Sequence, residues 1–511
     1  MTKHARPSRR TVSSGLLLVG ALAPFIGRVG EAQGDTIAPS GAKVDVDFQV
    51  SRGVLFRSER YNNLTRDSGW VEQRPADVRF MNEIGLHGSI YRVWARDEAY
   101  NRATGAYDYS ALIPYLRDAS ELSDALLLNL NIGMMVKEAH ATPAQIKPVL
   151  KRMIGDLKSQ FPKIVYIEAT NEPDFQYSTL IPAGNLYSYY VPFYEAVNEV
   201  NDELRPHLPL KVGGPTVSQF NLTYLRAFLD GYRADQARRK RLDFISYHGY
   251  GYFEAEGYGD GLAGGTALPP YHYYKSNPSD VATQRDRLDA ELRSRGLDVN
   301  IPSFIDELGL YPGPSFDNET DMRPDYLRQA AGTTSLIYWY MQNPKNVPFN
   351  WVMRHRTEGR KDQLVTRVAQ GQPIPTGQLT PYGNALLMMS KMKRTRVLAN
   401  SDALVAGKGV YAVAAKDETG ASIALWNYQH VNDAAFNVSM SLRNLPHGLR
   451  RARVRERVFR IDQTTSNYFS DPVTGNLQQV SERVVDGAGL SVVAADLSPN
   501  AMQLVLLEPA T

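Results

Sequence analysis

The stretch Ile164-Val-Tyr-Ile-Glu-Ala-Thr-Asn-Glu-Pro-Asp174 joins an apolar, β-branched run to a polar end. It follows a helical pattern over residues 142–160. Side chains alternate along a strand, so Glu168 and Glu172 share one face. Pro173 ends the run, because proline has no N–H to give to a sheet. The stretch therefore predicts a strand that carries two carboxylates to its carboxyl end.

Similar apolar runs recur along the first three quarters of the chain, with helical patterns between them. An eighth run must precede residue 75, and it is either Lys43–Val50 or Val54–Arg60. Alternating strands and helices indicate parallel βαβ units, and eight units over about 350 residues predict an α/β fold with a (β/α)8 barrel. A doubly wound sheet is the rival, but no GxGxxG motif follows an early strand. The seven clear runs are Gly88–Ala95, Ala125–Asn131, Ile164–Asn171, Leu210–Gly214, Leu242–His248, Ile301–Glu307 and Val347–Val352, and the clearest helical stretches are Thr142–Gln160, Leu186–Leu204, Leu222–Arg239, Asp280–Arg295 and Asp325–Met341.

The pattern changes to a period of two from about residue 394. Turn residues at 417–420 separate two alternating runs, which is a hairpin signal. We therefore expect a catalytic barrel over residues 45–393 and a C-terminal antiparallel β-sandwich domain over residues 394–511. Residues 36–50, with the alternating Val44-Asp-Val-Asp-Phe48, are candidates to join the sandwich. The expected sandwich strands are Gly409–Ala415, Ala421–Tyr428, Ala434–Leu442, Arg451–Ile461, Gly489–Ala495 and Ala501–Leu507.

The N-terminal segment has the character of an export signal. A basic start with Arg9 and Arg10 precedes an uncharged, mostly apolar run from Gly15 to Gly27, which is too short to span a bilayer. The run Ser8-Arg-Arg-Thr-Val12 partly resembles a twin-arginine signal. We expect residues 1–33 to be a signal peptide and the mature protein to be periplasmic or secreted, with no membrane span. An uncleaved N-terminal anchor is the alternative.

The composition excludes several classes of protein. The chain of 511 residues has no Cys, which excludes disulfides, thiolate metal sites and thiol nucleophiles. Its nine His form no HExxH pair, so we expect neither a metal nor a cofactor. Residues 1–33 carry five basic side chains and one acid, so without them the net charge falls from +3 to −1. We expect no nucleic-acid partner, and the basic run Arg238–Arg241 reads as a solvated helix end.

Two glutamates stand at the ends of predicted strands, Glu172 on the fourth and Glu307 on the seventh. Barrel enzymes carry their chemistry at the carboxyl ends of the strands. Two carboxylates across a barrel mouth suit glycoside hydrolysis, in which one protonates the leaving oxygen and the other attacks the anomeric carbon or activates water. The acid needs a raised pKa, which a nearby carboxylate supplies. A lone rim glutamate ordinarily pairs with an arginine for structural reasons, but two at these positions favour catalysis.

These motifs resemble those of the glycoside hydrolases of clan A, the retaining (β/α)8 glycosidases. Within the clan the chain is most similar to family 39, which contains β-xylosidases, α-L-iduronidases and bacterial exopolysaccharide hydrolases. The resemblance covers about residues 45–510 and is strongest at the motifs. The residues that match the family motifs are Glu168, Asn171-Glu-Pro-Asp174, Ser246-Tyr-His-Gly-Tyr-Gly251, Glu307 and Thr380-Pro-Tyr382.

The resemblance implies a role for each of the motif residues and a carbohydrate as the partner. Glu172 would be the general acid/base, and Glu307 would be the nucleophile that forms a glycosyl–enzyme intermediate. Asn171 would hydrogen-bond the 2-hydroxyl of the sugar. His248 and Tyr250 would line the pocket, and either would orient Glu307. A retaining reaction requires the two carboxyl groups to lie roughly 5–5.5 Å apart.

Two further residues at strand ends are candidates for substrate binding. Arg92 would pair with Glu307 and hold it ionised. Trp351 would form a stacking platform under the sugar. Purely structural interpretations stand beside these roles: Arg92 as a neutraliser of a rim carboxylate, Trp351 as core, and His248 as a satisfied structural histidine.

The sequence departs from the family pattern at two places. Thr170 stands where the family has an aromatic residue, and Asp306 stands where it often has Thr. Because adjacent strand residues point in opposite directions, we expect Asp306 to face away from Glu307. The Tyr- and Gly-rich segment 249–274 and the segment 354–378, with Arg354, His355, Arg356 and Arg360, are the candidates to set the substrate specificity. The first has a loop that only packs on the barrel as its alternative. The bases of the second are candidates to meet a uronic acid or another anionic group, and ordinary exposed arginines are the favoured alternative.

Two other classes remain open at this point: a carbohydrate-binding protein without activity, and a different barrel enzyme such as a lyase or a metal-dependent hydrolase. A catalytically inactive carbohydrate-binding protein would keep the pocket but lack one glutamate, and both are present. A Schiff-base lyase needs a Lys at a strand end, whereas Lys211 lies early in its strand. A metal-dependent hydrolase needs clustered His and Asp, whereas the strand ends offer one His. The sugar, the linkage and the oligomeric state stay undetermined.

Overall fold

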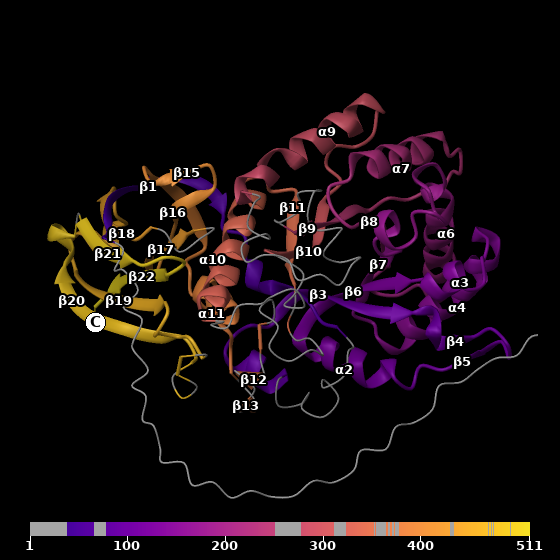
Figure 1. Ribbon diagram of the computed structural model, residues 1–511, viewed down its shortest axis with the longest axis horizontal. Coiled ribbons are helices and arrows are strands. Elements are labelled where there is room, and N and C mark those ends of the chain that lie inside the picture. Colours follow the sequence, from indigo (N-terminus) through magenta and orange to yellow (C-terminus); the bar gives the residue numbers. More distant parts are fainter. Residues whose placement is uncertain are drawn as a thin grey trace, which may run out of the picture. The chain divides into compact units, whose positions relative to one another are not determined.

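Eight parallel strands close into a barrel in the computed structural model (Figure 1). The structure describes residues 38–65, 78–250, 277–310, 323–350 and most of 378–510, with short pieces between 351 and 373. The predicted export signal, residues 1–33, lies outside the described residues. Around the barrel the strands are β2 (Tyr61–Asn63), β3 (Gly88–Arg96), β6 (Ser123–Asn131), β7 (Ile164–Ala169), β8 (Lys211–Val217), β9 (Phe244–Tyr250), β10 (Ser303–Gly309) and β11 (Asn346–Asn350).

The seven strands predicted from clear apolar runs are confirmed, but both candidates for the first strand are wrong. The first barrel strand is β2, whose three residues bridge β3 and β11. A strand of three residues shows no alternation, so the sequence contains no signal for it. Residues 40–54 instead form the long strand β1 of the second sheet, so the barrel begins after residue 54 rather than at residue 45.

Helices alternate with the barrel strands, as the sequence pattern predicts. Residues 78–83, after β2, are also helical. Thr142 caps α4 through a capping box with Gln145, which explains the sharp helix start before Pro143. The basic run 238–241 lies beyond the end of α7, so it is not a helix end. The helices are α2 (Leu112–Leu122), α4 (Pro143–Gln160), α6 (Leu186–Leu204), α7 (Leu222–Ala234), α9 (Gln284–Ser294), α10 (Arg323–Tyr340) and α11 (Pro381–Ser390).

An aromatic layer fills the amino-terminal end of the barrel interior. Rings from strands that are not neighbours meet there, including Tyr166 on β7 and Phe304 on β10, whose centroids are 5.5 Å apart. Phe304 also stacks on Phe244 at 4.5 Å. Because strand side chains alternate, the next inward layer lies two residues further along each strand. That layer is polar, and it begins the candidate site.

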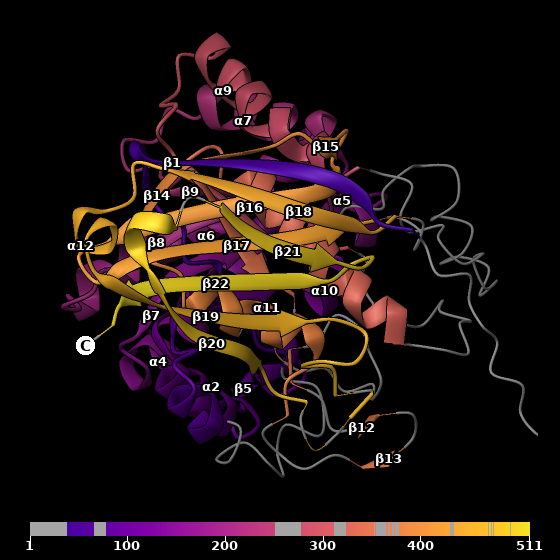
Figure 2. The same cartoon turned by 90° about the vertical axis from the view of Figure 1, so that its left-hand side faces the viewer.

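A second, ten-stranded sheet is ordered β20-β19-β22-β17-β16-β14-β1-β18-β21 with β15 beside β16 (Figure 2). Two short pairs lie outside both sheets: β4 (Tyr100–Asn101) with β5 (Ala106–Tyr107), and β12 (Val368–Ala369) with β13 (Gln372–Pro373). Apolar side chains from both parts of this path share one core, which includes Val44, Met440 and Leu507, so the sheet folds over on itself. Against α10, the indole of Trp426 donates to Ser335 at 2.8 Å. The strands are β1 (Ser40–Val54), β14 (Thr395–Ser401), β15 (Leu404–Val405), β16 (Lys408–Asp417), β17 (Gly420–Tyr428), β18 (Phe436–Arg443), β19 (Arg453–Ile461), β20 (Gln478–Asp486), β21 (Val492–Leu497) and β22 (Met502–Pro509).

The expected C-terminal β-sandwich is confirmed, with two differences. β1 joins it from the other end of the chain, as Val44–Phe48 suggested, but it pairs with β18 in parallel, so the sheet is mixed rather than purely antiparallel. β20 was not predicted, because its side chains are almost all exposed and show no apolar face. Among the described residues, no helix is both long and apolar enough to cross a membrane.

Candidate active site

Arg92 is the centre of the polar layer above the aromatic floor. It follows Ile90 of that floor by two residues on β3, and its side chain is fully buried. Its guanidinium donates through Nε to Glu168 (2.7 Å) and through Nη1 to Glu307 (2.7 Å). Nη1 also donates to Oδ1 of Asn63 at 3.2 Å. One cation therefore joins carboxylates from β7 and β10 across the barrel interior.

Glu307 is held by donors from two sides. Besides Arg92, the hydroxyl of Tyr250 donates to its Oε2 at 2.7 Å. The carboxylate is 7% exposed, so it can reach a ligand at the barrel mouth. The expected pairing with Arg92 is confirmed, and of the two candidates for orienting Glu307, Tyr250 makes the short hydrogen bond.

Asp306 also points inward, so the expectation that it faces away was wrong. It follows Phe304 of the aromatic floor by two residues and is fully buried. The ladders of β10 with β9 and with β11 both shift register between Ile305 and Leu308. This irregularity turns Glu307 to the same side as its neighbour, because one extra residue breaks strict alternation.

Glu172 lies past the end of β7 on strained backbone. Its φ is +46°, and that of Thr170 is +62°, values that L-residues rarely adopt and that tend to occur at functional sites. The N–H of Glu172 donates to the carbonyl of Thr216 at 2.8 Å, which fixes this turn against β8. Its carboxylate accepts from Gln176 at 2.8 Å and is 19% exposed.

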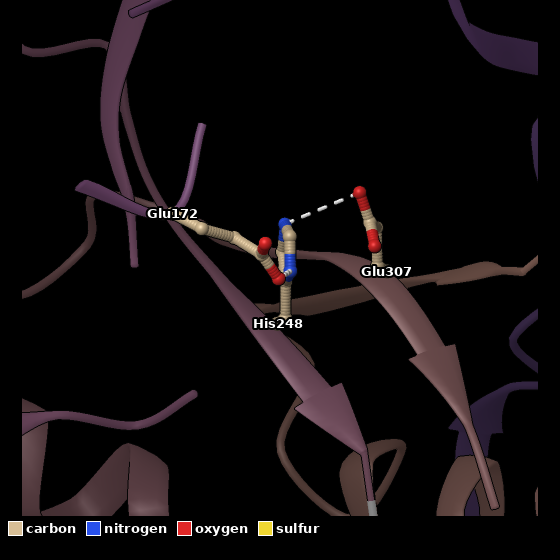
Figure 3. A group of neighbouring side chains, drawn as sticks. All are labelled: Glu172, His248 and Glu307. Carbon is tan, nitrogen blue, oxygen red and sulfur yellow. Dashed lines mark hydrogen bonds and ion pairs between the residues drawn. The ribbon is translucent and has the colours of Figure 1, made fainter. Parts of the chain in front are cut away.

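His248 stands between the two glutamates, as Figure 3 shows. Its Nδ1 lies 3.0 Å from Glu172 Oε1, and its Nε2 lies 3.4 Å from Glu307 Oε1. One oxygen of each carboxylate lies within 4.8 Å of the other. A retaining glycosidase needs carboxyl groups roughly 5–5.5 Å apart, so the observed approach suits that reaction rather than an inverting one.

His248 changes the pKa that was expected for Glu172, the proposed acid. Burial opposes the protonated imidazole, but the carboxylates of Glu307 and Glu172 outweigh burial and raise its pKa above 6.5. Burial also favours the neutral form of Glu172, but the hydrogen bond and charge of His248 prevail and lower its pKa. The raised pKa expected for the acid is therefore wrong. Both shifts favour a proton on His248, whose Nδ1 lies 3.0 Å from the carboxylate of Glu172.

Removal of His248 should move the pH profile of activity to lower pH. The active form needs a proton on Glu172, and in the wild type the raised pKa of His248 keeps a proton beside that carboxylate to higher pH than a carboxyl alone would. In His248→Gln only a carboxyl holds it, and carboxyls lose protons at lower pH. We expect the alkaline limb of kcat/KM to fall by about one pH unit. An unchanged alkaline limb would show that His248 does not share this proton.

Asp306 and Glu168 form a buried carboxyl pair behind the nucleophile. Both side chains are fully buried, so two negative charges there would repel each other, which favours a proton on one of them. Neither oxygen of Asp306 has a hydrogen-bond partner among the described residues, whereas Glu168 accepts from Arg92 at 2.7 Å and from Asn129 at 2.8 Å. Burial and the charge of Glu168 raise the pKa of Asp306 well above its usual range. Burial also disfavours the Glu168 carboxylate, but Arg92 outweighs it and lowers its pKa. The proton therefore resides on Asp306.

A neutral Asp306 should tolerate replacement by its amide. Asp306→Asn keeps the shape and the zero charge of the protonated side chain, so we expect kcat/KM at pH 7 to stay within about threefold of wild type. Glu168→Gln removes the charge that faces Arg92 and should cost clearly more. The measurement compares initial rates of the two purified variants. Equal losses of activity would mean that Asp306 does not carry the proton.

The other predicted residues also reach the site. Asn171 Oδ1 accepts from Arg92 Nη2 at 3.1 Å, which orients its amide nitrogen away from the arginine. Trp351 is half-buried after β11, with its ring edge-on to Trp94 at 6.4 Å. The guanidinium of Arg92 lies 4.2 Å from the Trp94 ring centroid. Hydrogen bonds and ion pairs thus join six of the seven residues proposed from the sequence, and Trp351 contacts this group only through Trp94. The segments 251–276 and 354–363 lie outside the described residues.

Sequence reasoning missed several supporting side chains. Asn63 was missed because the first barrel strand was not recognised, although it donates to the Asp306 carbonyl at 2.7 Å. Asn129 is a polar residue within an apolar run, and that break in pattern is a usable signal. Gln176 lies in the short helix α5 (Pro173–Gln176) after the strand. The contact of Gln176 with Glu172 depends on the backbone turn at Glu172, which the sequence pattern does not predict.

Glu172, His248 and Glu307 also have the spacing of a three-ligand metal site. Two carboxylates and an imidazole are acceptable ligands for several divalent ions. Arg92, however, already places a positive charge 2.7 Å from Glu307. That charge opposes a metal cation at the same carboxylate, so the donor set fits the two-carboxylate chemistry better.

The fold and the site together define a class: a (β/α)8 barrel with a facing pair of glutamates at its mouth and a β-sandwich beside it. The sequence matches no family model and no curated protein. Solved structures do match in fold, and they confirm the resemblance to family 39 and clan A at that level. The monomeric β-xylosidase of Caulobacter crescentus CB15 aligns with a TM-score of 0.65 at 14% identity, covering 92% of this chain and 100% of the other. A bacterial orthologue of human α-L-iduronidase gives 0.65 at 13% identity, over 93% and 85% of the chains. The GH39 enzyme of Xanthomonas axonopodis pv. citri gives 0.62 at 14%, over 93% and 98%.

Proposed function

We propose that the protein is a retaining glycoside hydrolase that cleaves an extracellular oligo- or polysaccharide. The observation that carries this proposal is the approach of Glu172 and Glu307 to within 4.8 Å, each with its own polar partners. The solved structures with the same fold include a xylosidase and a GH39 enzyme, which supports the class of reaction. No cofactor enters the proposal.

The reaction proceeds in two displacements. Glu307 attacks the anomeric carbon while Glu172 gives its proton to the leaving oxygen, so the glycosidic C–O bond breaks as the glycosyl–enzyme bond forms. Glu172, now ionised, then takes a proton from water, whose oxygen attacks the same carbon and releases Glu307. His248 stores the proton beside Glu172 between turnovers. Asn171 donates its free amide to the 2-hydroxyl, and Trp351 supports the sugar ring.

An inactive carbohydrate-binding protein on the same fold is the alternative. It would need a defect in the acid or the nucleophile, and neither glutamate is missing or displaced. A Schiff-base lyase is disfavoured, because Lys211 is the first residue of β8 and lies at the opposite end of the strand from the site.

The stereochemistry of the product tests the proposal. We expect the purified protein to cut at least one member of a panel of bacterial exopolysaccharides and plant glycans, with retention of the anomeric configuration in proton NMR spectra. The digestion is run with and without EDTA, and we expect no difference. Inverted products would contradict the double displacement, and loss of activity in EDTA would favour a metal-dependent hydrolase. Binding without cleavage would favour the alternative.

We further propose that residues 1–33 direct export, which places the enzyme in the periplasm or outside the cell. The basic start and the short apolar run of the sequence support this. The β-sandwich is proposed as an accessory domain that supports the barrel, since its strands pack on α10. Trp426 of β17 donates to Ser335 of α10, and Trp339 of α10 donates to Tyr411 of β16 at 3.0 Å.

A further inference from the structure

A cavity of about 1020 Å³ lies between the barrel and the β-sandwich, far from the glutamates. It is lined by Tyr61, Ser89 and Asn346, which begin or lie near the beginning of β2, β3 and β11. The catalytic groups lie at the other, carboxyl ends of the barrel strands. Its opposite wall is β14, together with the end of β1. The volume is at the upper end of the range typical of ligand sites.

The cavity is strongly basic. Of the described residues that line it, four are arginines and none is an acid. Arg57 and Arg60 have carboxylate partners, Glu59 at 2.6 Å and Asp124 at 2.9 Å. The other two, Arg52 and Arg396, form no ion pair with any described residue.

Arg396 is a half-buried cation that has no counter-ion among the residues the structure describes. Its guanidinium lies 5.6 Å from the Tyr338 ring centroid and donates to Gln342 at 3.1 Å. Burial lowers its pKa, and the nearby charge of Arg52 lowers it further. Unpaired, partly desolvated cations are costly, so an anion that entered the cavity would be bound favourably.

The cavity also offers groups that suit sugar rings. Phe56 and Tyr61 stack at 5.0 Å with an interplanar angle of 15°, and both are half-buried. Amide side chains, including Gln342, Asn343 and Asn400, lie around them. Aromatic faces with amides suit a sugar with its hydroxyls, and arginines suit a carboxylate through paired N–H donors.

We propose that this cavity is a second carbohydrate-binding site, which takes a glycan that carries carboxylate groups. The class of ligand, a glycan, rests on the proposed function, but binding here requires no cleavage. The site would hold an acidic chain on the enzyme while the barrel mouth acts on the same or another chain. In this site the ligand would contact Arg52, Arg396 and the ring of Phe56.

Isothermal titration tests the proposal with hexagalacturonate as the probe and xylohexaose as a neutral ligand of equal length. The full chain carries Glu307→Gln so that no ligand is consumed. We expect binding of hexagalacturonate that weakens with added salt, and at least about tenfold weaker binding in Arg52→Gln/Arg396→Gln. Phe56→Ala should also weaken binding, although it changes no charge.

The matched control is Arg233→Gln/Arg238→Gln, which removes two exposed arginines that also have no ion pair among the described residues. It should bind like the parent. Equal weakening in both double variants, equal affinity for the neutral hexasaccharide, or no binding of hexagalacturonate would overturn the site. Tighter binding of a single-stranded DNA hexamer would overturn the glycan assignment. If the NMR experiment shows no cleavage with retained configuration but arginine-dependent binding of hexagalacturonate persists, the proposed reaction is wrong and the proposed binding site is supported.

Discussion

Glu307→Gln should lower kcat on the best glycan substrate by on the order of 10⁵-fold, because the amide cannot form the glycosyl–enzyme ester. That loss corresponds to about 7 kcal/mol of the activation barrier. The fold should survive, since Gln is isosteric and its carbonyl oxygen can still accept from Arg92, while the Tyr250 hydroxyl can accept from its amide nitrogen. Initial rates over a wide range of enzyme concentrations, with circular dichroism as the folding check, make the measurement.

Two matched variants separate the roles. Glu172→Gln should lose as much activity on a polysaccharide but far less on a 2,4-dinitrophenyl glycoside, whose leaving group needs no proton. Glu307→Gln should be inactive on both. Glu456→Gln, at a buried glutamate of the β-sandwich, should behave like wild type. Substantial activity of Glu307→Gln on either substrate would sink the nucleophile assignment.

The fold was predictable where hydrophobic periodicity is strong. The strand predicted over Ile164–Asn171 is β7 (Ile164–Ala169), because buried parallel strands are continuous apolar runs. α6 was predicted over its full length because its apolar face repeats over five turns. β2 and β20 were not predictable in the same way. One is too short to alternate, and the other has no buried face.

The candidate site was predictable to the level of which residues meet, but not to the level of their protonation. Strand-end positions sufficed for Glu172 and Glu307, because a closed parallel barrel brings all strand ends to one rim. Arg92 was expected at a strand end but lies in the middle of β3, and it reaches the site because its side chain points into the barrel. The inward turn of Asp306 depends on a register shift, which a sequence pattern of period two cannot contain. The position of His248 between two carboxylates is likewise a product of three-dimensional distance, and it reverses the expected pKa shift of the acid.

Arg92→Met should destabilise the protein by about 3–5 kcal/mol at pH 7.5, because it leaves buried carboxylates without their cation. Glu168 and Glu307 each lose a 2.7 Å ion pair, and both are nearly or fully buried. The midpoint of urea unfolding measures the loss. Activity should fall as well, since Glu307 and Asn171 lose the group that orients them.

The pH dependence of this loss distinguishes charge from packing. With Arg92 the pKa of Glu168 is lowered in the folded state, so the carboxylate adds stability above its unfolded pKa, and this stability is lost as the pH falls. Without Arg92, burial raises that pKa, so the folded state becomes less stable as the pH rises above the unfolded pKa. The difference between wild type and Arg92→Met should therefore shrink between pH 7.5 and pH 4.5. Arg285→Met is the matched control, since Arg285 is equally buried but its partner Asp289 keeps an ion pair with Lys345 at 2.8 Å. A destabilisation of Arg92→Met that is equal at both pH values would mean that the arginine acts by filling space rather than by neutralising the carboxylates.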